Sequence, residues 1–477
     1  MRPNHNKIKR TNARASPSSD GYYGYAANAR ASPRSDENPD HRLAVPLFEL
    51  RIATWNIGTM TGRSAELSAI LERRRINLCC VQETKWKGAK SRQIGKGFKL
   101  IYNGIENTKN GVGIVLDKYL SENVVEINRI SDRIMSVKIA LEKQPCLNVL
   151  SVYAPQVNCQ EAEKQQFWED LHDLLKTLPA TEQKVVCGDL NGHVGKDRDG
   201  FEGYHGGFGF GRQNSEGATI MEFAASQNLA VVNTFFQKKE EHLITYKSGR
   251  AKTQIDYILI DKQNLKQIKD CKIIPGEPLT SQHRLLLAAL KLRKPVKIIR
   301  PKVENIKWHE LKTEKGNSLR KKIANFMCEH PPRDNTPTEI WKKFENHCVN
   351  AAKLELGTSK GALHNTKDTK WWNTQAKDSV SEKKRLFKIW QKSGSPEDKE
   401  LYQSAKKTAR RTVATEKERA NIDLYQRLEL ATDTDVYKIA KHRYNDCKDF
   451  RITKYIKNEE GLLLTDNADI CKRWHRL

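Results

Sequence analysis

The chain has 477 residues, and its 84 lysine and arginine residues exceed its 58 aspartate and glutamate residues by 26. Only 38% of the residues are hydrophobic, and the sequence contains no run of about 20 apolar residues of the kind that spans a membrane. The ten cysteines are scattered without a Cys-x-x-Cys pair, which argues against a zinc site or a disulfide scaffold and favours a reducing compartment. The positive charge makes a polyanion the expected partner, with nucleic acid favoured over a membrane surface.

The composition divides the sequence into three regions. Residues 1–47 are rich in Ser, Pro, Asn, Ala and Arg, and residues 12–20 recur in similar form as residues 28–36. Such a segment cannot bury enough apolar surface to offset the entropy lost on ordering, so we predict that it is disordered. Residues 48–296 predict one large globular domain, and residues 297–477 are dominated by Lys, Glu, Arg, Asn and Thr.

Short apolar runs and helical patterns alternate through the globular region. The apolar runs predict buried strands, and several of them are rich in β-branched residues. They cover residues 50–55, 78–81, 112–116, 149–153, 185–187, 229–232, 255–260 and 285–292. Apolar residues at helical spacing predict helices over residues 65–74 and 161–178. We therefore expect an α/β fold of four layers, in which two packed β-sheets are flanked by helices.

The C-terminal region predicts one or two long basic helices over residues 379–430, with basic clusters at residues 383–385, 406–407 and 410–411. A basic face of this kind is either a solvated helix surface or a contact for nucleic acid, DNA or RNA, and the sequence leaves both open. The last residues, 470–477, follow an amphipathic pattern without a helix stop signal, so we interpret the chain as truncated.

Polar residues stand at or near the ends of the predicted strands, where α/β folds commonly place their chemistry. They are Asn56, Glu83, Tyr153, Asp189, Asn191, Asp256 and His283. Most of them have an ordinary structural explanation when taken singly. Glu83 could cap a turn, Asp189 and Asn191 could form an Asx turn, and Tyr153 and His283 could be structural residues. Asp256 differs, because a carboxylate in an apolar strand costs several kcal/mol to bury unless a partner pairs with it.

The ordered set of motifs is more specific than its members. In chain order it reads Trp-Asn, Gln-Glu-Thr, Tyr-Ala-Pro, Gly-Asp-Leu-Asn, Ile-Asp-Tyr-Ile and Ser-x-His, and the match covers nearly all of residues 50–292. This set resembles the exonuclease–endonuclease–phosphatase superfamily, which includes DNase I, the abasic-site endonucleases and the endonuclease domains of non-LTR retrotransposons. Residues 188–195 and 243–257 look most like the endonuclease of RTE/BovB-type elements, where a helical linker leads to a reverse transcriptase. Residues 297–477 look like that linker, and the sequence contains no Tyr/Phe-x-Asp-Asp signature of a polymerase.

The resemblance implies an endonuclease that depends on Mg²⁺, or on Mn²⁺, and nicks one DNA strand in the nucleus to leave a 3′-hydroxyl. Such hydrolysis needs an activated water, a cation near the phosphate and support for the leaving oxygen. Mg²⁺ prefers one or two protein carboxylates, and the resemblance makes Glu83 its ligand with the amide of Asn56 nearby. It gives Asp189 the task of orienting and deprotonating the water.

The resemblance also assigns the remaining candidates. Asn191 would hold the water or the phosphate, and Tyr153 would donate to a phosphate oxygen. Protonated His283 would stabilise the charge on the phosphate, with Asp256 fixing its ring and raising its pKa. Two positions depart from the family pattern. Gln282 stands where the family commonly has aspartate, and Gln156 stands where it often has asparagine, so we expect a nuclease activity that is retained but weaker.

Basic residues near these motifs predict phosphate contacts, each of which would make DNA binding depend on salt. We assign this role to Lys85, Lys87, Arg198, Lys247 and Arg250, with Lys90, Arg92, Lys196 and Lys252 as further candidates. Trp86 either stacks on a nucleotide or packs within its loop. No element that reads base sequence is evident, so we expect DNA shape and backbone contacts to set the cut.

Two other functions stay open on the sequence. A catalytically weak or silent DNA- or chromatin-binding protein is favoured by Gln282 and by the absent polymerase motif. A hydrolase of phosphoinositides or other small phosphoesters would share the fold, but it would not need the basic C-terminal region.

Overall fold

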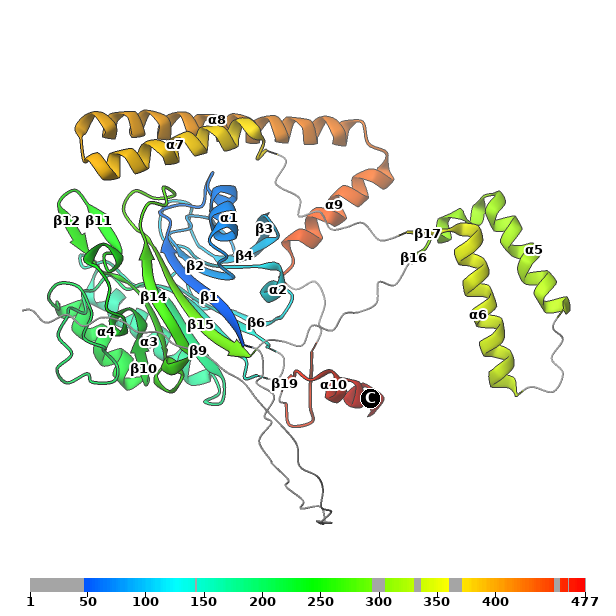
Figure 1. Cartoon of the computed structure of the whole chain (residues 1–477), viewed down its shortest axis with the longest axis horizontal. Coiled ribbons are helices and arrows are strands. Elements are labelled where there is room, and N and C mark those ends of the chain that lie inside the picture. Colours follow the sequence, from blue (N-terminus) through cyan, green and yellow to red (C-terminus); the bar gives the residue numbers. More distant parts are fainter. Residues whose placement is uncertain are drawn as a thin grey trace, which may run out of the picture. The chain divides into compact units, whose positions relative to one another are not determined.

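The computed structural model describes residues 47–141, 144–293, 305–329, 336–359, 371–449, 455–461 and 463–476. The predicted disorder of the N-terminal region, up to residue 46, lies outside the described residues. None of the helices in the described ranges is long and apolar enough to cross a membrane. Most of the strands belong to two large sheets (Figure 1).

The first sheet has seven strands in the order β14-β15-β1-β2-β5-β4-β3. β1 pairs in parallel with β2 and antiparallel with β15, so that Asn56 lies beside Gln82 where β1 and β2 end. Every side chain of β2 is buried, as expected for a strand covered on both faces. The strands are β1 (Leu47–Asn56), β2 (Leu78–Gln82), β3 (Lys90–Gly95), β4 (Phe98–Asn103), β5 (Val112–Leu116), β14 (Ile268–Ile274) and β15 (Leu285–Arg293).

The second sheet has six strands in the order β10-β13-β9-β8-β7-β6. Tyr153 on β8 pairs with Asp189 on the parallel strand β9, and Asp189 pairs in turn with Asp256 on the antiparallel strand β13. This register alone puts three of the candidate site residues in one row. The strands are β6 (Val124–Arg129), β7 (Ile134–Ile139), β8 (Leu147–Tyr153), β9 (Gln183–Asp189), β10 (Leu229–Val231) and β13 (Asp256–Asp261).

Apolar clusters hold four layers together (Figure 1). The central cluster lies between the sheets and includes Leu50 of β1 and Val137 of β7. Phe167 and Met221 belong to a second cluster, which packs two helices on the outer face of the second sheet. Leu67 belongs to a third, which packs one helix on the outer face of the first sheet. These helices are α3 (Glu161–Thr177), α4 (Ser215–Ser226) and α1 (Ser64–Arg73). The predicted sandwich of two sheets flanked by helices is confirmed.

The helix α4 forms where the sequence predicts no element. Asn214 caps it, since its side-chain oxygen accepts a hydrogen bond of 2.9 Å from the backbone N–H of Gly217. Its buried face is formed by Gly217, Ile220, Met221 and Ala224, which follow helical spacing. Two of these four residues are small, so the apolar periodicity of the sequence is weak.

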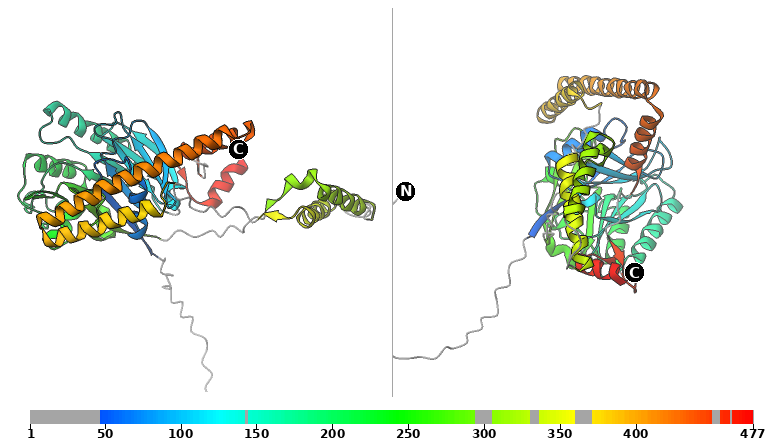
Figure 2. Two further views of the ribbon diagram at one scale, coloured as in Figure 1. Left: turned by 90° about the horizontal axis from the view of Figure 1, so that it is seen from above. Right: turned by 90° about the vertical axis from the view of Figure 1, so that its right-hand side faces the viewer.

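The basic helices predicted over residues 379–430 are two, α7 (Thr374–Ser393) and α8 (Pro396–Glu429). They run side by side in each view (Figures 1 and 2). The break between them has three local causes. Gly394 takes the left-handed conformation that ends α7, Ser395 accepts a hydrogen bond from the backbone N–H of Asp398, and Pro396 opens α8.

The other described elements are short or belong to the region after β15. They are α2 (Lys118–Ser121), β11 (Tyr246–Ser248), β12 (Ala251–Thr253), β16 (Asn305–Ile306), α5 (Glu314–Glu329), α6 (Pro337–Leu356), β17 (Thr358–Ser359), α9 (Asp433–Cys447), β18 (Ile456–Lys457), β19 (Leu463–Leu464) and α10 (Asn467–Arg476), with 3₁₀ helices at Val232–Phe235, Glu240–His242, Lys262–Gln267 and Trp308–Lys312. β11 and β12 form a hairpin just before β13.

The close pairing of β8 and β9 generates a stability prediction. A Cβ atom on Gly188 would lie 2.0 Å from the carbonyl oxygen of Val152, so a Gly188→Ala change must push the two strands apart. We expect it to lower the free energy of unfolding by about 1–3 kcal/mol, measured by denaturant melts. The change Ser248→Ala at an exposed position is the control. Equal stability of the two variants would contradict the prediction.

Candidate active site

The ends of strands from both sheets bring the candidate residues together. The first sheet supplies Asn56 at the end of β1 and Glu83 directly after β2, while the row Tyr153, Asp189 and Asp256 comes from the second sheet. His283 precedes β15. Residues separated by as many as 227 positions in the chain therefore meet at one end of the sandwich.

Glu83 is held as a charged carboxylate. Its Oε1 accepts hydrogen bonds from Asn56 Nδ2 at 2.8 Å and from the hydroxyl of Tyr153 at 3.2 Å, and its Oε2 lies 2.9 Å from Lys85 Nζ. Burial alone would raise the pKa of Glu83, but the hydrogen bonds from Asn56 and Lys85 hold it below its ordinary value. Glu83 and Lys85 both have positive φ angles, 53° and 50°, and this turn folds the lysine back onto the glutamate.

The two carboxylate oxygens of Asp189 have different partners: Oδ1 binds the backbone of a turn, and Oδ2 binds side chains of the site. Oδ1 accepts a hydrogen bond of 3.1 Å from the backbone N–H of Asn191, which is the Asx turn considered as the ordinary explanation. Oδ2 accepts a hydrogen bond of 3.1 Å from Asn56 Nδ2 and lies 3.7 Å from His283 Nε2. Burial and the neighbouring carboxylate of Asp256 raise the pKa of Asp189 to about 7. The side chain of Asp189 thus stabilises a turn through one oxygen and also has a raised pKa.

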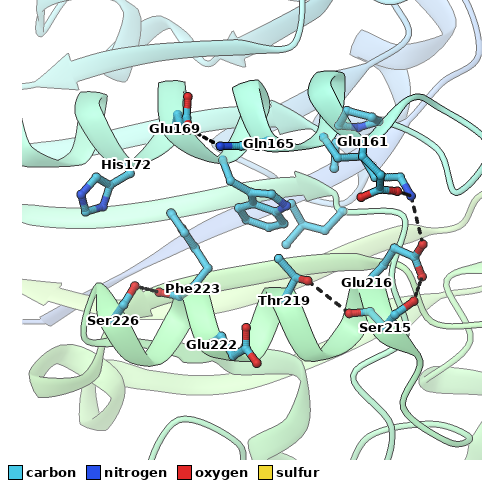
Figure 3. Close-up of a pocket in the computed structure, with 15 residues that line it drawn as sticks. Glu161, Gln165, Glu169, His172, Ser215, Glu216, Thr219, Glu222, Phe223 and Ser226 are labelled. Atoms are coloured by element: carbon cyan, nitrogen blue, oxygen red, sulfur yellow. Dashed lines mark hydrogen bonds and ion pairs between the residues drawn. The ribbon is translucent and has the colours of Figure 1, made fainter.

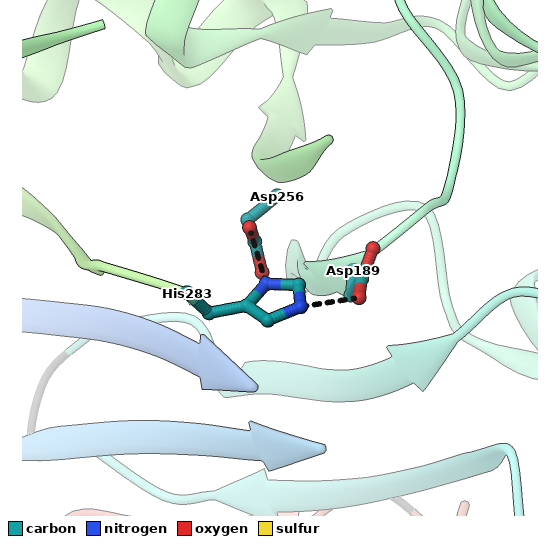
Figure 4. A group of neighbouring side chains, drawn as sticks. All are labelled: Asp189, Asp256 and His283. Atoms are coloured by element: carbon teal, nitrogen blue, oxygen red, sulfur yellow. Dashed lines mark hydrogen bonds and ion pairs between the residues drawn. The ribbon is translucent and has the colours of Figure 1, made fainter. Parts of the chain in front are cut away.

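His283 lies between the carboxylates of Asp189 and Asp256 (Figure 4). Its Nδ1 is 3.1 Å from Asp256 Oδ2, and Asp256 is fully buried. Burial would lower the pKa of His283, but Asp256 and then Asp189 outweigh it and raise the pKa to about 9. The ring is therefore protonated at neutral pH, and Asp256 has the partner that its burial demands.

The loops after β8 and β9 fix Tyr153 and Asn191. The hydroxyl of Tyr153 donates to Glu83 and accepts a hydrogen bond of 3.4 Å from Nε2 of Gln156, the residue that stands where the family often has asparagine. Asn191 Nδ2 donates to the carbonyl oxygen of Ala154 at 2.7 Å, so one amide hydrogen already binds the backbone. Its role toward water or phosphate stays a prediction.

Two residues that support the site, Gln82 and Arg133, are not among the candidates that the sequence offers. Gln82 is fully buried and links the sheets, because it donates to Ser151 Oγ on β8 and accepts from Thr54 Oγ1 on β1, both at 3.3 Å. The guanidinium of Arg133 lies 5.2 Å from the centre of the Tyr153 ring. Gln82 belongs to the Gln-Glu-Thr motif and could have been singled out there. Arg133 follows no pattern visible in the sequence.

Two further aromatic residues hold His283 from its other sides. The indole N–H of Trp55 donates to the carbonyl oxygen of His283 at 3.2 Å, and the ring of Tyr246 meets the imidazole edge-on at 4.9 Å. Gln282 Nε2 donates to the hydroxyl of Tyr246 at 3.1 Å. The glutamine at the position of the family's aspartate therefore contacts the tyrosine that packs on the histidine.

The basic residues predicted to contact nucleic acid divide into two groups. Lys87, Arg198, Lys247 and Arg250 are exposed, whereas Lys85 is half-buried against Glu83. Trp86 packs within its loop, since its indole N–H donates to Thr61 Oγ1 at 3.1 Å and its ring meets that of Tyr102 edge-on. Of the two interpretations of Trp86, the structure favours packing.

Two groups of side chains could be considered as ligands of a divalent cation, and their protonation states distinguish them. Ligand atoms of Asp189, Asp256 and His283 lie within 4.8 Å of one another. A protonated imidazole has no free lone pair for a metal, so this group is an ion-paired triad as long as His283 keeps its proton. Glu83 is an ionised carboxylate and fits a Mg²⁺ ion that takes few protein ligands. Asn56 orients this carboxylate, because its Nδ2 donates to Glu83 while its Oδ1 accepts a hydrogen bond of 3.0 Å from the backbone N–H of Gly58.

A cavity of about 770 Å³ lies elsewhere, between α3 and α4 (Figure 3). Trp168 and Phe223 line it, together with polar side chains such as Glu161 and Glu216. It faces the outer side of the second sheet. None of the seven candidate residues lines it, so it is separate from the acid–histidine site.

Fold and site together define an α/β sandwich protein with an acid–amide–histidine centre at the strand ends. Residues 53–277 match the Endonuclease/Exonuclease/phosphatase family. The resemblance carried by the sequence motifs is therefore confirmed for this part of the chain.

Similar proteins include Craniofacial development protein 2 of Bos taurus, which is 30% identical over 61% of this chain and 49% of its own length. The chain thus spans about half the length of the curated relatives it matches. An AP endonuclease from Archaeoglobus fulgidus is 20% identical, with a TM-score of 0.40 over 50% of this chain and 99% of that protein. The endonuclease domain of TRAS1, a telomere-specific non-LTR retrotransposon, is 13% identical, with a TM-score of 0.39 over 52% of this chain and 100% of that domain.

The ion pair of Glu83 with Lys85 generates a prediction about metal affinity. The ammonium group neutralises the carboxylate that fits Mg²⁺, so a Lys85→Met change should tighten Mg²⁺ binding. We expect about a two- to fivefold lower Kd by calorimetry, since partly exposed ion pairs contribute about 0.5–1 kcal/mol. Lys87→Met, two residues away and exposed, is the matched control. A Kd that Lys85→Met leaves unchanged or raises would refute the prediction.

Proposed function

We propose that the domain is a DNA endonuclease that depends on a divalent cation and hydrolyses a phosphodiester bond in one strand, leaving a 3′-hydroxyl. The observation that supports this most is the meeting of ionised Glu83, a carboxylate with a raised pKa in Asp189, and protonated His283 within one hydrogen-bonded group. The family match of residues 53–277 supports hydrolysis of phosphate esters in general, and the net charge of +26 supports a polyanionic substrate. Chromosomal DNA as the substrate would place the protein in the nucleus.

Asp189 is the base in this proposal. A carboxylate with a pKa of about 7 is partly ionised at neutral pH and basic enough to take a proton from water. The water oxygen attacks phosphorus and the bond from phosphorus to the 3′ oxygen breaks. The 3′ oxygen then takes a proton from solvent, and the products are a 5′-phosphate and a 3′-hydroxyl. Asn56 holds Asp189 and Glu83 in place, because its amide donates to both.

The other side chains act on the phosphate. His283, protonated and fixed by Asp256, supplies a positive charge for the phosphate as negative charge builds up. Burial and the nearby Glu83 raise the pKa of Tyr153, so its hydroxyl keeps its proton and stays a hydrogen-bond donor. A Mg²⁺ ion held by Glu83, which Asn56 orients, would neutralise charge on the phosphate when bound.

A protein that binds DNA without cutting it is the second candidate. Gln282 favours it, because a glutamine bound to Tyr246 supplies no negative charge at the position of the family's aspartate. RNA is a further proposed partner of the basic C-terminal region. Cleavage and binding assays on the same preparation separate these functions.

The endonuclease proposal predicts the behaviour of two isosteric variants. With supercoiled plasmid and Mg²⁺, Asp189→Asn should lower the nicking rate by about 10²–10⁴-fold, because the base is lost. Glu83→Gln should reduce it as well and raise the Mg²⁺ concentration needed. The exposed Asp173→Asn on α3 is the control. Nicking that survives in both site variants would come from a contaminant or from another site and would refute the assignment.

The pKa of His283 predicts the alkaline side of the pH profile. Because the protonated ring is the active form, the rate should fall as pH rises through about 9. In Asp256→Asn the strongest cause of the raised pKa is removed, so the fall should begin nearer the ordinary histidine value of about 6.5. Initial nicking rates over a pH series test this. An alkaline limb that Asp256→Asn leaves in place would show that another group controls it.

A further inference from the structure

The helices α7 and α8 are joined to the sandwich by buried contacts. Lys383 Nζ on α7 binds both carboxylate oxygens of Glu66 on α1, at 2.7 and 2.8 Å, and each side chain is only 9% exposed. Ala65 of α1 packs in an apolar cluster with Trp372, Ala376 and Val413. A buried ion pair of this geometry leaves an uncompensated charge if either partner is removed. The two helices are thus a fixed part of the surface and not a free linker.

This attachment brings α8 beside residues 57–63, the loop that follows Asn56. Gly62 lies against Val413 of α8. In the same loop the guanidinium of Arg63 donates to the carbonyl oxygen of Ile57, the residue next to Asn56. The charge of Glu83 also acts on Arg63. The inner side of α8 is therefore close to the rim of the candidate active site.

Three cations of α8 share the side of the helix next to this contact. Lys406, Arg410 and Lys417 are separated by four and seven residues, which keeps them within about 40° around the helix axis. They flank the buried positions Tyr402 and Val413. From first to last they extend over about 16 Å, since an α-helix rises about 1.5 Å per residue.

Other positive charges act on Lys406 and Lys417. In the described part of the chain, no ion pair links Lys406, Arg410 or Lys417 to an acidic side chain. Burial, then Arg410 and Arg63, lowers the pKa of Lys406. Burial, then Arg92, lowers the pKa of Lys417, whose ammonium lies 4.7 Å from the centre of the Trp371 ring. Lys406 and Lys417 are half-buried and Arg410 is exposed. Positive charges that repel one another are stabilised by an anion that lies across them.

We propose that Lys406, Arg410 and Lys417 bind the sugar–phosphate backbone of duplex DNA beside the cleaved bond. This inference rests on the proposed DNA substrate and extends its binding surface from the domain onto α8. A row of about 16 Å covers between four and five of the intervals of about 3.4 Å that separate successive phosphates of one strand along the duplex axis. Contacts of this kind position a duplex without reading its sequence. The basic face that the sequence left open, as solvated surface or nucleic-acid contact, is assigned to nucleic acid.

The chain offers a matched pair of variants for the test. Lys406→Ala/Arg410→Ala removes two cations from the proposed surface, and Lys407→Ala/Arg411→Ala removes the adjacent lysine and arginine, both exposed, from another face of α8. The net charge, residue types and spacing of the two double variants are identical. Lys406→Gln/Arg410→Gln serves as a further inner-face variant, and melting temperatures verify that each variant folds.

Binding of the full chain to a duplex of about 25 base pairs is followed by fluorescence anisotropy in EDTA, over a series of salt concentrations. The inner-face variants should bind about tenfold more weakly, and the slope of log K against log salt should fall by about 1.8, for two lost phosphate contacts. The outer-face variant should change much less. Equal losses in the two double variants, or a larger loss on duplex RNA than on DNA, would overturn the inference. Because binding is measured without cleavage, a chain that binds as expected but does not nick plasmid would refute the proposed function alone.

Discussion

Two buried carboxylates on adjacent strands repel each other unless a cation lies beside them, and the site is built around this constraint. The β9–β13 register makes Asp189 and Asp256 direct neighbours, and the imidazole of His283 contacts both. The three groups therefore depend on one another: the histidine keeps its proton because of the aspartates, and the aspartates tolerate burial because of the histidine. Trp55 and Tyr246 hold the histidine at this point, so its position is set by the first sheet as well as by the aspartates of the second.

The carboxylate of Glu83 is held differently from those of Asp189 and Asp256, and this difference affects its proton affinity. Glu83 is only partly buried and draws its stabilisation from Asn56, Tyr153 and Lys85 at its rim. Hydrogen bonds lower its pKa while burial raises that of Asp189, so two carboxylates joined through one amide differ in proton affinity. Because its pKa is low, Glu83 is suited to stay charged beside a cation. Because its pKa is raised, Asp189 is suited to exchange a proton near neutral pH.

The apolar runs of the sequence predicted eight strands of the two large sheets, including the edge strand β10, but not β3, β4, β6, β7 and β14. The predicted strands contain short apolar runs, whereas β3, β6 and β14 mix polar with apolar residues, and β4 and β7 each carry a lysine between apolar residues. The site residues were found because each belongs to a short motif at a strand end. The residues that support them were not found from the sequence, because pairs such as Gln82 with Ser151, or Arg133 with Tyr153, depend on how the sheets stack. Lys85 was expected to contact phosphate, and its pairing with Glu83 follows from a backbone turn that composition cannot reveal.

The contact of Glu66 with Lys383 also limits how the domain can be divided from the rest of the chain. The family match ends at residue 277 and the last strand of the two large sheets at Arg293, yet the cationic partner of Glu66 lies 90 residues beyond that strand. A fragment cut after the sandwich would carry a lone carboxylate on α1 beside the apolar surface that Trp372 and Val413 cover in the intact chain. Poor solubility of such a fragment would then be a property of the cut and not of the catalytic fold.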